Sequence, residues 1–116
     1  MTRKEVFEYC RQQYKTEPDY PWHDWNAVQR HSDNGKWYGL VMEVDRGKIG
    51  LDGEGEVDIL NVKCDPVFAS YLRRQPGFSP AYHMNKKHWY TMILDGSVER
   101  RELFRRIDES YRLAVK

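Results

Sequence analysis

The sequence predicts an α+β domain in which an antiparallel sheet carries its helices on one face. Apolar residues recur at helical spacing near the start, the middle and the end of the chain, and alternating segments bounded by turn residues lie between them. The expected order of elements is α-β-β-β-α-β-β-α, which indicates this layered class. The chain has 116 residues and shows neither a repeat nor a linker, so residues 1–116 are expected to form one domain.

The chain is expected to begin with a helix. Thr2 followed by Glu5 is a capping box, which places the first helical residue at Arg3. The helix should end near residue 14, because two prolines follow between residues 15 and 21. Its inner face would be an apolar stripe at helical spacing: Val6, Phe7, Cys10 and Tyr14. The aromatic segment 20–25, YPWHDW, is expected to cover the sheet edge and lead into a strand at 27–31.

Two further strands are expected around an acidic connection. An Asn-Gly pair at 34–35 predicts a tight turn, and residues 36–44 then alternate between two faces. One face of this strand would carry Tyr38, Leu40, Met42 and Val44. Residues 45–56 are rich in glycine and acids, which predicts a mobile loop. The next strand, 57–64, would turn the following side chains to one face: Leu60, Val62 and Cys64.

The second half is expected to add a helix, two strands and a last helix. Asp65 as the N-cap and Pro66 at the first helical position begin the helix, and Gln-Pro-Gly at 75–77 ends it. Its buried stripe would be Val67, Phe68, Tyr71 and Leu72. Strands at 78–83 and 88–94 would flank a short turn at 84–87. The last helix, from about Val98 to Val115 with Ser97 as its cap, would turn these residues inward: Leu103, Phe104, Ile107, Tyr111, Ala114 and Val115.

The composition and the N-terminus indicate a cytoplasmic protein without a membrane segment. No apolar run approaches the roughly 18 residues of a membrane span, and charges stand where a signal peptide needs an apolar stretch. Cys10 and Cys64 stand far apart, without the spacing of a zinc site. A reduced compartment disfavours a disulfide between them. We expect a monomer with no metal and no cofactor.

Opposite charges gather in different parts of the chain. The formal net charge is only +1, which predicts no partner by itself. Residues 43–65 contain seven acids against three bases, whereas residues 66–94 contain no acid. We therefore expect an acidic end and a basic end. The basic and histidine side chains of the acid-free stretch are Arg73, Arg74, His83, Lys86, Lys87 and His88.

The densest chemistry lies in residues 80–96, PAYHMNKKHWYTMILDG. A metal would need a third protein ligand beside His83 and His88, and an acid–base pair would need a carboxylate nearer than Asp95. No nucleophile motif is present, and the glycines of segment 45–56 stand among acids that would repel phosphate. The residues therefore predict no catalytic activity. An enzyme acting on a small anion is a third alternative, which a pocket with a perturbed His83 or His88 would favour.

A basic turn between two strands fits the binding of nucleic acid better than catalysis. Lys86 and Lys87 at the tip would neutralise phosphates. Asn85 could reach a base edge, and Trp89 could supply a stacking face. Taken one at a time, the same residues have commoner structural roles: Trp89 in a core, Asn85 as a turn former and His83 as a half-buried hydrogen-bonding group. Only the acid-free basic stretch, taken as a whole, favours nucleic-acid binding over these structural roles.

Four segments resemble the MmcQ/YjbR family of small bacterial proteins: GKWYGL (35–40), VKCDP (62–66), PAYHMNKKHWYTMILDGS (80–97) and SYRLAV (110–115). The resemblance covers essentially the whole chain, although residues 45–56 are longer and more acidic than the family pattern. It implies a CyaY-like fold and a DNA-binding label attached to a double-wing shape, with no enzymatic activity and no cofactor. Carried onto this sequence, the label points to His83, Asn85, Lys86, Lys87, His88 and Trp89.

We therefore expect a non-catalytic, cytoplasmic protein that binds DNA through a basic wing at residues 83–89. Arg73 and Arg74 would extend that surface. The alternative is a protein–protein or small-ligand module, in which aromatic side chains and the basic patch meet an acidic partner. Both readings are electrostatic, so the response to salt does not separate them.

Overall fold

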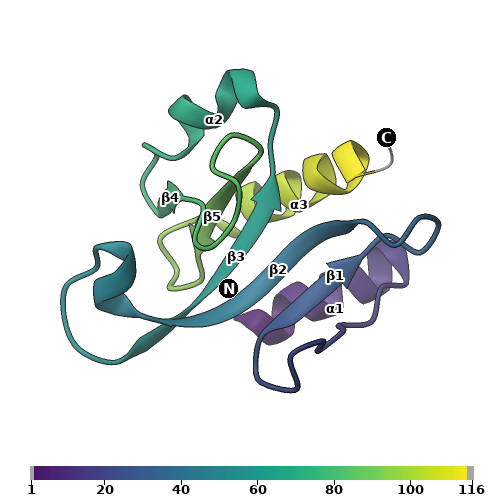
Figure 1. The fold of residues 1–116 in the computed structure, drawn as a ribbon, viewed down its shortest axis with the longest axis horizontal. Helices are drawn as coiled ribbons and strands as arrows, with labels where there is room; N and C mark the ends of the chain where they lie inside the picture. The colour runs from purple at the N-terminus through teal and green to yellow at the C-terminus, as the bar shows by residue number, and fades with distance from the viewer. Residues whose placement is uncertain (1, 115–116) are drawn as a thin grey trace.

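The computed structural model describes residues 2–114, which form a five-stranded antiparallel sheet and three α-helices (Figure 1). In space the strands lie in the order β1-β2-β3-β5-β4. Along the chain the elements are α1 (Arg3–Tyr14), β1 (Ala27–Arg30), β2 (Trp37–Asp45), the 3-10 turn η1 (Arg46–Ile49), β3 (Glu56–Lys63), α2 (Pro66–Leu72), β4 (Phe78–Pro80), β5 (Trp89–Ile93) and α3 (Arg100–Ala114). The α+β class predicted from the sequence is confirmed.

Helix α1 begins and ends where the sequence predicts. The Thr2 hydroxyl accepts a hydrogen bond from the Glu5 N–H at 3.3 Å, and the Glu5 carboxylate accepts one from the Thr2 N–H at 3.2 Å. This reciprocal cap satisfies N–H groups that the first turn leaves without partners. Arg3 is only 6% exposed and donates two hydrogen bonds, of 2.8 and 3.1 Å, to the Asp58 carboxylate on β3. The pair holds the start of α1 against the sheet.

The main core lies between the sheet and the helices. One cluster of buried side chains contains residues of α1, α2 and α3 together with residues of the strands. Leu103 and Ile107 of α3 belong to it, and Leu60, Val62 and Cys64 meet them from β3 and the residue after it. The predicted alternation of the third strand is therefore confirmed.

A smaller cluster covers the other face of the sheet. None of the α-helical residues within 2–114 belongs to this cluster. Its cover comes from the segment around η1 and from the chain that follows β4. Its buried members are Val44, Val57, Ile59 and Ile93, with Met42, Ile49, Leu51 and Tyr82 packed against them.

Tyr38 faces the helices and does not share the face of Met42 and Val44, contrary to the sequence prediction. Arg30 pairs with Trp37 whereas Gln29 pairs with Gly39, so β2 carries one extra residue at Tyr38. This bulge shifts the alternation by one position and places Tyr38 in the main core. Strict alternation along residues 36–44 could not show it, because the bulge exists only in the pairing with β1.

The acidic connection between β2 and β3 is built around η1, where the sequence predicted a mobile loop. The Asp45 carboxylate accepts a hydrogen bond from the Gly47 N–H at 2.9 Å and so caps η1. The Arg46 N–H donates to the Gly55 carbonyl at 3.0 Å, and the Leu51 N–H donates to the Arg46 carbonyl at 3.0 Å. These bonds close the connection across its own width, so residues 46–49 form a regular turn within the predicted loop.

Helix α2 begins as predicted but turns a different side inward. The Asp65 carboxylate accepts a hydrogen bond from the Val67 N–H at 3.0 Å, and Pro66 is the first helical residue. The buried residues of α2 are Ala69 and Leu72. The predicted buried stripe is wrong for three of its four members: Val67, Phe68 and Tyr71 are 80%, 54% and 62% exposed.

The last two strands are shorter than predicted. Because β4 ends at Pro80 and β5 begins at Trp89, the connection between them spans residues 81–88 instead of 84–87. Helix α3 begins at Arg100, so Ser97 lies too far upstream to cap it, and the Ser97 hydroxyl donates to the Asp95 carboxylate instead. Val115, predicted on the inner face of α3, lies outside the described residues.

Gly77, just before β4, provides a test of this packing. A Cβ atom there would lie 2.5 Å from Val98 Cγ2 and 2.7 Å from Ser97 Oγ, at a φ of +83°. We predict that Gly77→Ala lowers the free energy of unfolding by about 2–4 kcal/mol, since it adds overpacking to a left-handed backbone. Gly50→Ala is the control, because Gly50 has a φ of +78° with nothing within 4 Å, and it should lose only about 1 kcal/mol. Equal losses in urea unfolding would contradict the clash.

Candidate nucleic-acid interface

The connection 81–88 is attached to the sheet by buried side chains rather than by the strand ladder. The last ladder pair joins Pro80 to Tyr90. Beyond it, the Tyr82 N–H donates to Thr91 Oγ1 at 3.0 Å, and Asn61 Nδ2 donates to the Tyr82 carbonyl at 3.0 Å. The Thr91 hydroxyl donates in turn to Asn61 Oδ1. Asn61 and Thr91 are fully buried, so the polar groups of both strands and of Tyr82 satisfy one another away from water.

The tip of the connection is shaped by Asn85. Its side-chain oxygen accepts the Lys87 N–H at 2.8 Å, and its carbonyl accepts the Trp89 N–H at 3.0 Å. The His88 carbonyl accepts the Cys64 N–H at 2.8 Å, which ties the end of the connection to the end of β3. The structural role of Asn85 as a turn former is therefore present. Its side-chain NH₂ group still offers two donors.

Five of the predicted site residues are exposed on this connection: His83, Asn85, Lys86, Lys87 and His88. Trp89 is different, because it is only 9% exposed and Lys63 Nζ lies 5.5 Å from its ring centroid. A ring so covered cannot offer a stacking face to a base, so Trp89 belongs to the core and to the support of the turn.

A groove of about 390 Å³ joins the connection to η1. Lys48 and Ile49 of η1 line it together with Tyr82, His83 and Lys86. No aspartate or glutamate is among the residues that line it. The two segments are far apart in the sequence. Figure 1 shows that η1 forms the far end of the long β2–β3 ribbon. Two lysines and a histidine thus line one recess together with apolar side chains.

Acidic side chains gather on the other face of the sheet. Glu43 lies opposite Asp58 in the β2–β3 ladder, two residues beyond Val41, which belongs to the helix-side core. A hydrogen bond with the neighbouring Glu56, together with partial desolvation, raises the pKa of the Glu43 carboxyl. The groove lies on the face with Ile49 and Tyr82 instead. The sheet therefore separates this acidic cluster from the groove.

The sequence missed Lys48 and overextended the site elsewhere. Lys48 lies in a segment with a net negative charge, so the charge count along the sequence did not identify it. The one local indication was the apolar neighbour Ile49, which packs against the smaller cluster. Arg73 caps the end of α2 and Arg74 follows it, and neither lines the groove. His88 lies beside a different recess, with Lys63 and Asp65.

The described residues carry little support for nucleophilic or metal chemistry. Burial raises the pKa of the Cys10 and Cys64 thiols to about 11, which keeps them protonated and unreactive near neutral pH. Within 2–114, no three side chains of the metal-binding types come together in a way that could hold an ion. The helices over the same range are too short or too polar to cross a membrane.

Comparison with known proteins finds a family model and relatives that align with most of the chain. A family model described as YjbR matches residues 11–113. The Bacillus subtilis (strain 168) protein "Uncharacterized protein YyaQ" is 43% identical over 115 residues, which cover 97% of this chain and 98% of that protein. The Escherichia coli (strain K12) protein "Uncharacterized protein YjbR" is 30% identical over 116 residues, which cover 99% and 88%.

Two solved structures are similar over nearly the whole chain. A crystal structure of a Pseudomonas syringae protein aligns with a TM-score of 0.95 at 42% identity, covering 98% of this chain and 99% of that one. The Deinococcus radiodurans protein DR2400, assigned to the domain DUF419, aligns with a TM-score of 0.74 at 28% identity, covering 99% and 79%.

The buried pair Asn61 and Thr91 provides the test of how the connection is held. We predict that Thr91→Val leaves the Tyr82 N–H and Asn61 Oδ1 without their hydrogen-bond partner and lowers the free energy of unfolding by about 1–3 kcal/mol. Amide exchange should accelerate in residues 81–88 more than in β2 or α3. Thr91→Ser keeps the hydroxyl and is the matched control. If valine and serine gave the same exchange pattern, the hydroxyl would not hold the connection.

Proposed function

We propose that this chain, which belongs to the YjbR family, is a non-catalytic cytoplasmic protein that binds DNA. It binds the phosphate backbone through the groove between residues 81–88 and η1. The observation that carries the proposal is the groove's lining, which contains Lys48, His83 and Lys86 and no carboxylate. Phosphate oxygens need cationic or N–H donors, and an acid in the recess would repel them.

The two chain segments act as two wings of one surface. The 81–88 connection and η1 project from neighbouring parts of the sheet and share the groove, which supports the double-wing, CyaY-like description of the fold. Lys87 stands exposed beside Lys86 at the tip, and the Asn85 NH₂ group is a third donor there. These groups position a backbone, whereas base-edge contacts would be limited to Asn85.

The charge of the protein limits the affinity. With a formal net charge of +1, long-range attraction to a polyanion is weak, and binding depends on the few cations at the groove. Each phosphate neutralised on duplex DNA contributes about 0.9 to the slope of log K against log[salt]. Three lysines, Lys48, Lys86 and Lys87, therefore imply a slope of about −3.

The second candidate function is a module for an acidic protein or a small anion. The groove has a mixed lining, with Ile49, Pro80 and Tyr82 beside its cations, and such a recess also suits a carboxylate with an apolar part. Heparin separates this function from DNA binding. A DNA-binding surface should prefer duplex or single-stranded DNA to heparin at matched charge, whereas a general anion site should not.

The decisive experiment is fluorescence anisotropy of labelled duplex and single-stranded DNA at several salt concentrations. We predict that Lys48→Glu weakens binding and makes the salt slope shallower by about one unit, as expected for one phosphate contact. The double variant Lys86→Glu/Lys87→Glu should abolish binding at 0.1 M salt. Lys4→Glu is the matched control, because Lys4 is exposed on α1, on the helix side of the sheet, and should leave the affinity within about twofold of the unmodified protein.

Two outcomes would reject the proposal. Absence of binding by the unmodified protein at 20 mM salt, where phosphate contacts are about at their strongest, would exclude DNA as the ligand. Equal losses in the Lys4 and Lys48 variants would show that only net charge matters and that the groove is not the contact surface.

A further inference from the structure

The outer side of α2 is apolar and uncovered. Val67, Phe68 and Tyr71 are the most exposed large hydrophobic residues of this helix, at 80%, 54% and 62%. Together they present on the order of 350 Å² of largely apolar surface, which is the size of the largest apolar patch on a typical monomer, and such patches are often functional. Only Ala69 and Leu72 hold α2 to the core. Most of the large apolar side chains of α2 are therefore exposed to solvent and do not pack in the core.

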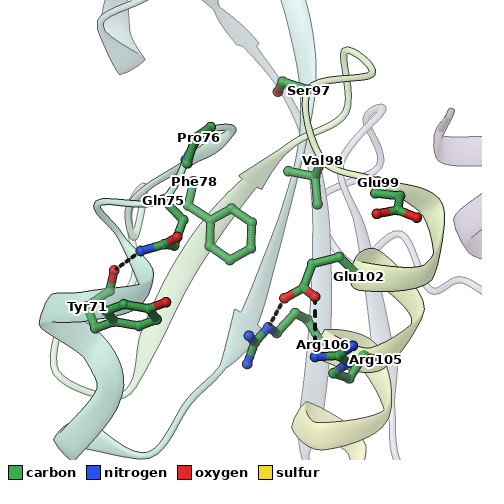
Figure 2. A pocket seen from close by; sticks show the side chains of 10 residues that line it. All are labelled: Tyr71, Gln75, Pro76, Phe78, Ser97, Val98, Glu99, Glu102, Arg105 and Arg106. Carbon is green, nitrogen blue, oxygen red and sulfur yellow. Dashed lines mark hydrogen bonds and ion pairs between the residues drawn. The ribbon is translucent and has the colours of Figure 1, made fainter.

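A groove runs beside this surface, between α2 and α3. Figure 2 shows Tyr71 on one wall and the Glu102 and Arg106 side chains on the other, with the Phe78 ring projecting between them. A second recess of about 270 Å³ continues from Phe68 and Tyr71 to Arg106. The exposed rings of Phe68 and Tyr71 therefore lie next to two recesses, and Tyr71 and Arg106 border both of them.

The Arg106 charge on the α3 wall is already neutralised within the chain. Arg106 Nε lies 2.6 Å from Glu102 Oε1, and Arg106 Nη1 lies 3.6 Å from Glu109 Oε2. These ion pairs are part-buried, with Arg106 18% exposed. A polyanion would have to compete with both carboxylates for the guanidinium, so the wall favours an apolar occupant over a phosphate backbone.

The ends of α2 carry opposite charges that select the occupant. Asp65 at the N-terminal end is exposed, and Arg74 just beyond the C-terminal end is exposed. When two copies of α2 pack antiparallel about a two-fold axis, Asp65 of each copy meets Arg74 of the other, while the apolar residues meet in the middle. A parallel arrangement would oppose like charges. The surface is therefore complementary to itself, as a two-fold interface requires.

We propose that the α2 face, defined by Val67, Phe68 and Tyr71, docks on the same face of a second copy of this chain. Phe68 of each copy enters the recess of the other, which Phe68, Tyr71 and Arg106 border. The apolar area is small beside the roughly 1,600 Å² of a standard stable interface, so the dimer is weak and depends on concentration. The inference does not rest on DNA binding.

Sedimentation velocity of the protein without DNA tests the proposal. The mass should rise from the 13.9 kDa of one chain towards twice that value as the concentration approaches about 1 mM, where even a 4 kcal/mol association is visible. Phe68→Ser/Tyr71→Ser should raise the dissociation constant at least tenfold. Trp22→Ser is the control, because Trp22 is also an exposed aromatic residue, at 47%, and lies outside the patch. Circular dichroism checks that each variant folds. If a variant does not fold, Val67→Glu is measured in its place, because Val67 is the most exposed of the three residues.

A second measurement locates the contact by cross-linking. Ser70 is exposed in the second half of α2, close to the proposed two-fold axis, and Ser70→Cys should form an intermolecular disulfide under mild oxidation. The native thiols do not interfere, since Cys10 and Cys64 are buried. Ser32→Cys, in the exposed turn after β1, is the control and should cross-link at least tenfold more slowly.

Three results would overturn the proposal. The mass could stay at one chain up to 1 mM. A dimer could form that the α2 variants leave unchanged, which would place the interface elsewhere. The α2 variants could lose DNA binding while every form sediments as one chain, which would assign the patch to nucleic acid. Loss of DNA binding in the Lys48 variant affects none of these readings, so the two proposals fail independently.

Discussion

The geometry of the groove depends on one buried polar pair, Asn61 and Thr91. β4 contributes only three residues to the ladder, so backbone pairing ends at Pro80 and cannot orient the chain that follows. Asn61 and Thr91 replace the missing ladder by satisfying both the N–H and the carbonyl of Tyr82. Because both side chains are fully buried, an unmet group would cost about 1–3 kcal/mol. This cost fixes Tyr82 on the sheet, and with it one wall of the groove.

Local sequence signals predicted the beginnings of α1 and α2, and failed where partners distant in sequence decide. Caps are written in adjacent residues, so Thr2 and Asp65 could be recognised without the fold. The position of Tyr38 depends on a bulge that exists only against β1. The inner side of α2 was mistaken because Ala69 and Leu72 suffice to hold a seven-residue helix, and apolar periodicity does not show which residues of a stripe find a neighbour.

The candidate site was predictable to the extent that it is one turn. The exposed residues from His83 to His88 follow from the composition of a connection between strands. Trp89 had two interpretations, a stacking face or a core side chain, and its place in β5, whose five residues are all buried, supports the core. Lys48 was out of reach, because its contribution arises only when η1 packs beside Tyr82. The segment that looked unsuited to phosphate by its average charge supplies one of the two lysines in the groove.

The groove and the α2 face bear on one physical problem, which is how a chain with a net charge of +1 could hold a polyanion. A few lysines per copy give only a weak, salt-sensitive contact. A two-fold pair would carry two grooves, and the second contact would then form at the effective concentration set by the first. Even a weak α2 interface would gain from this linkage, because a duplex that spans both grooves stabilises the dimer by mass action. The linkage requires that the two grooves reach phosphates of one duplex, so dimer formation should be promoted by DNA longer than that span and not by shorter DNA.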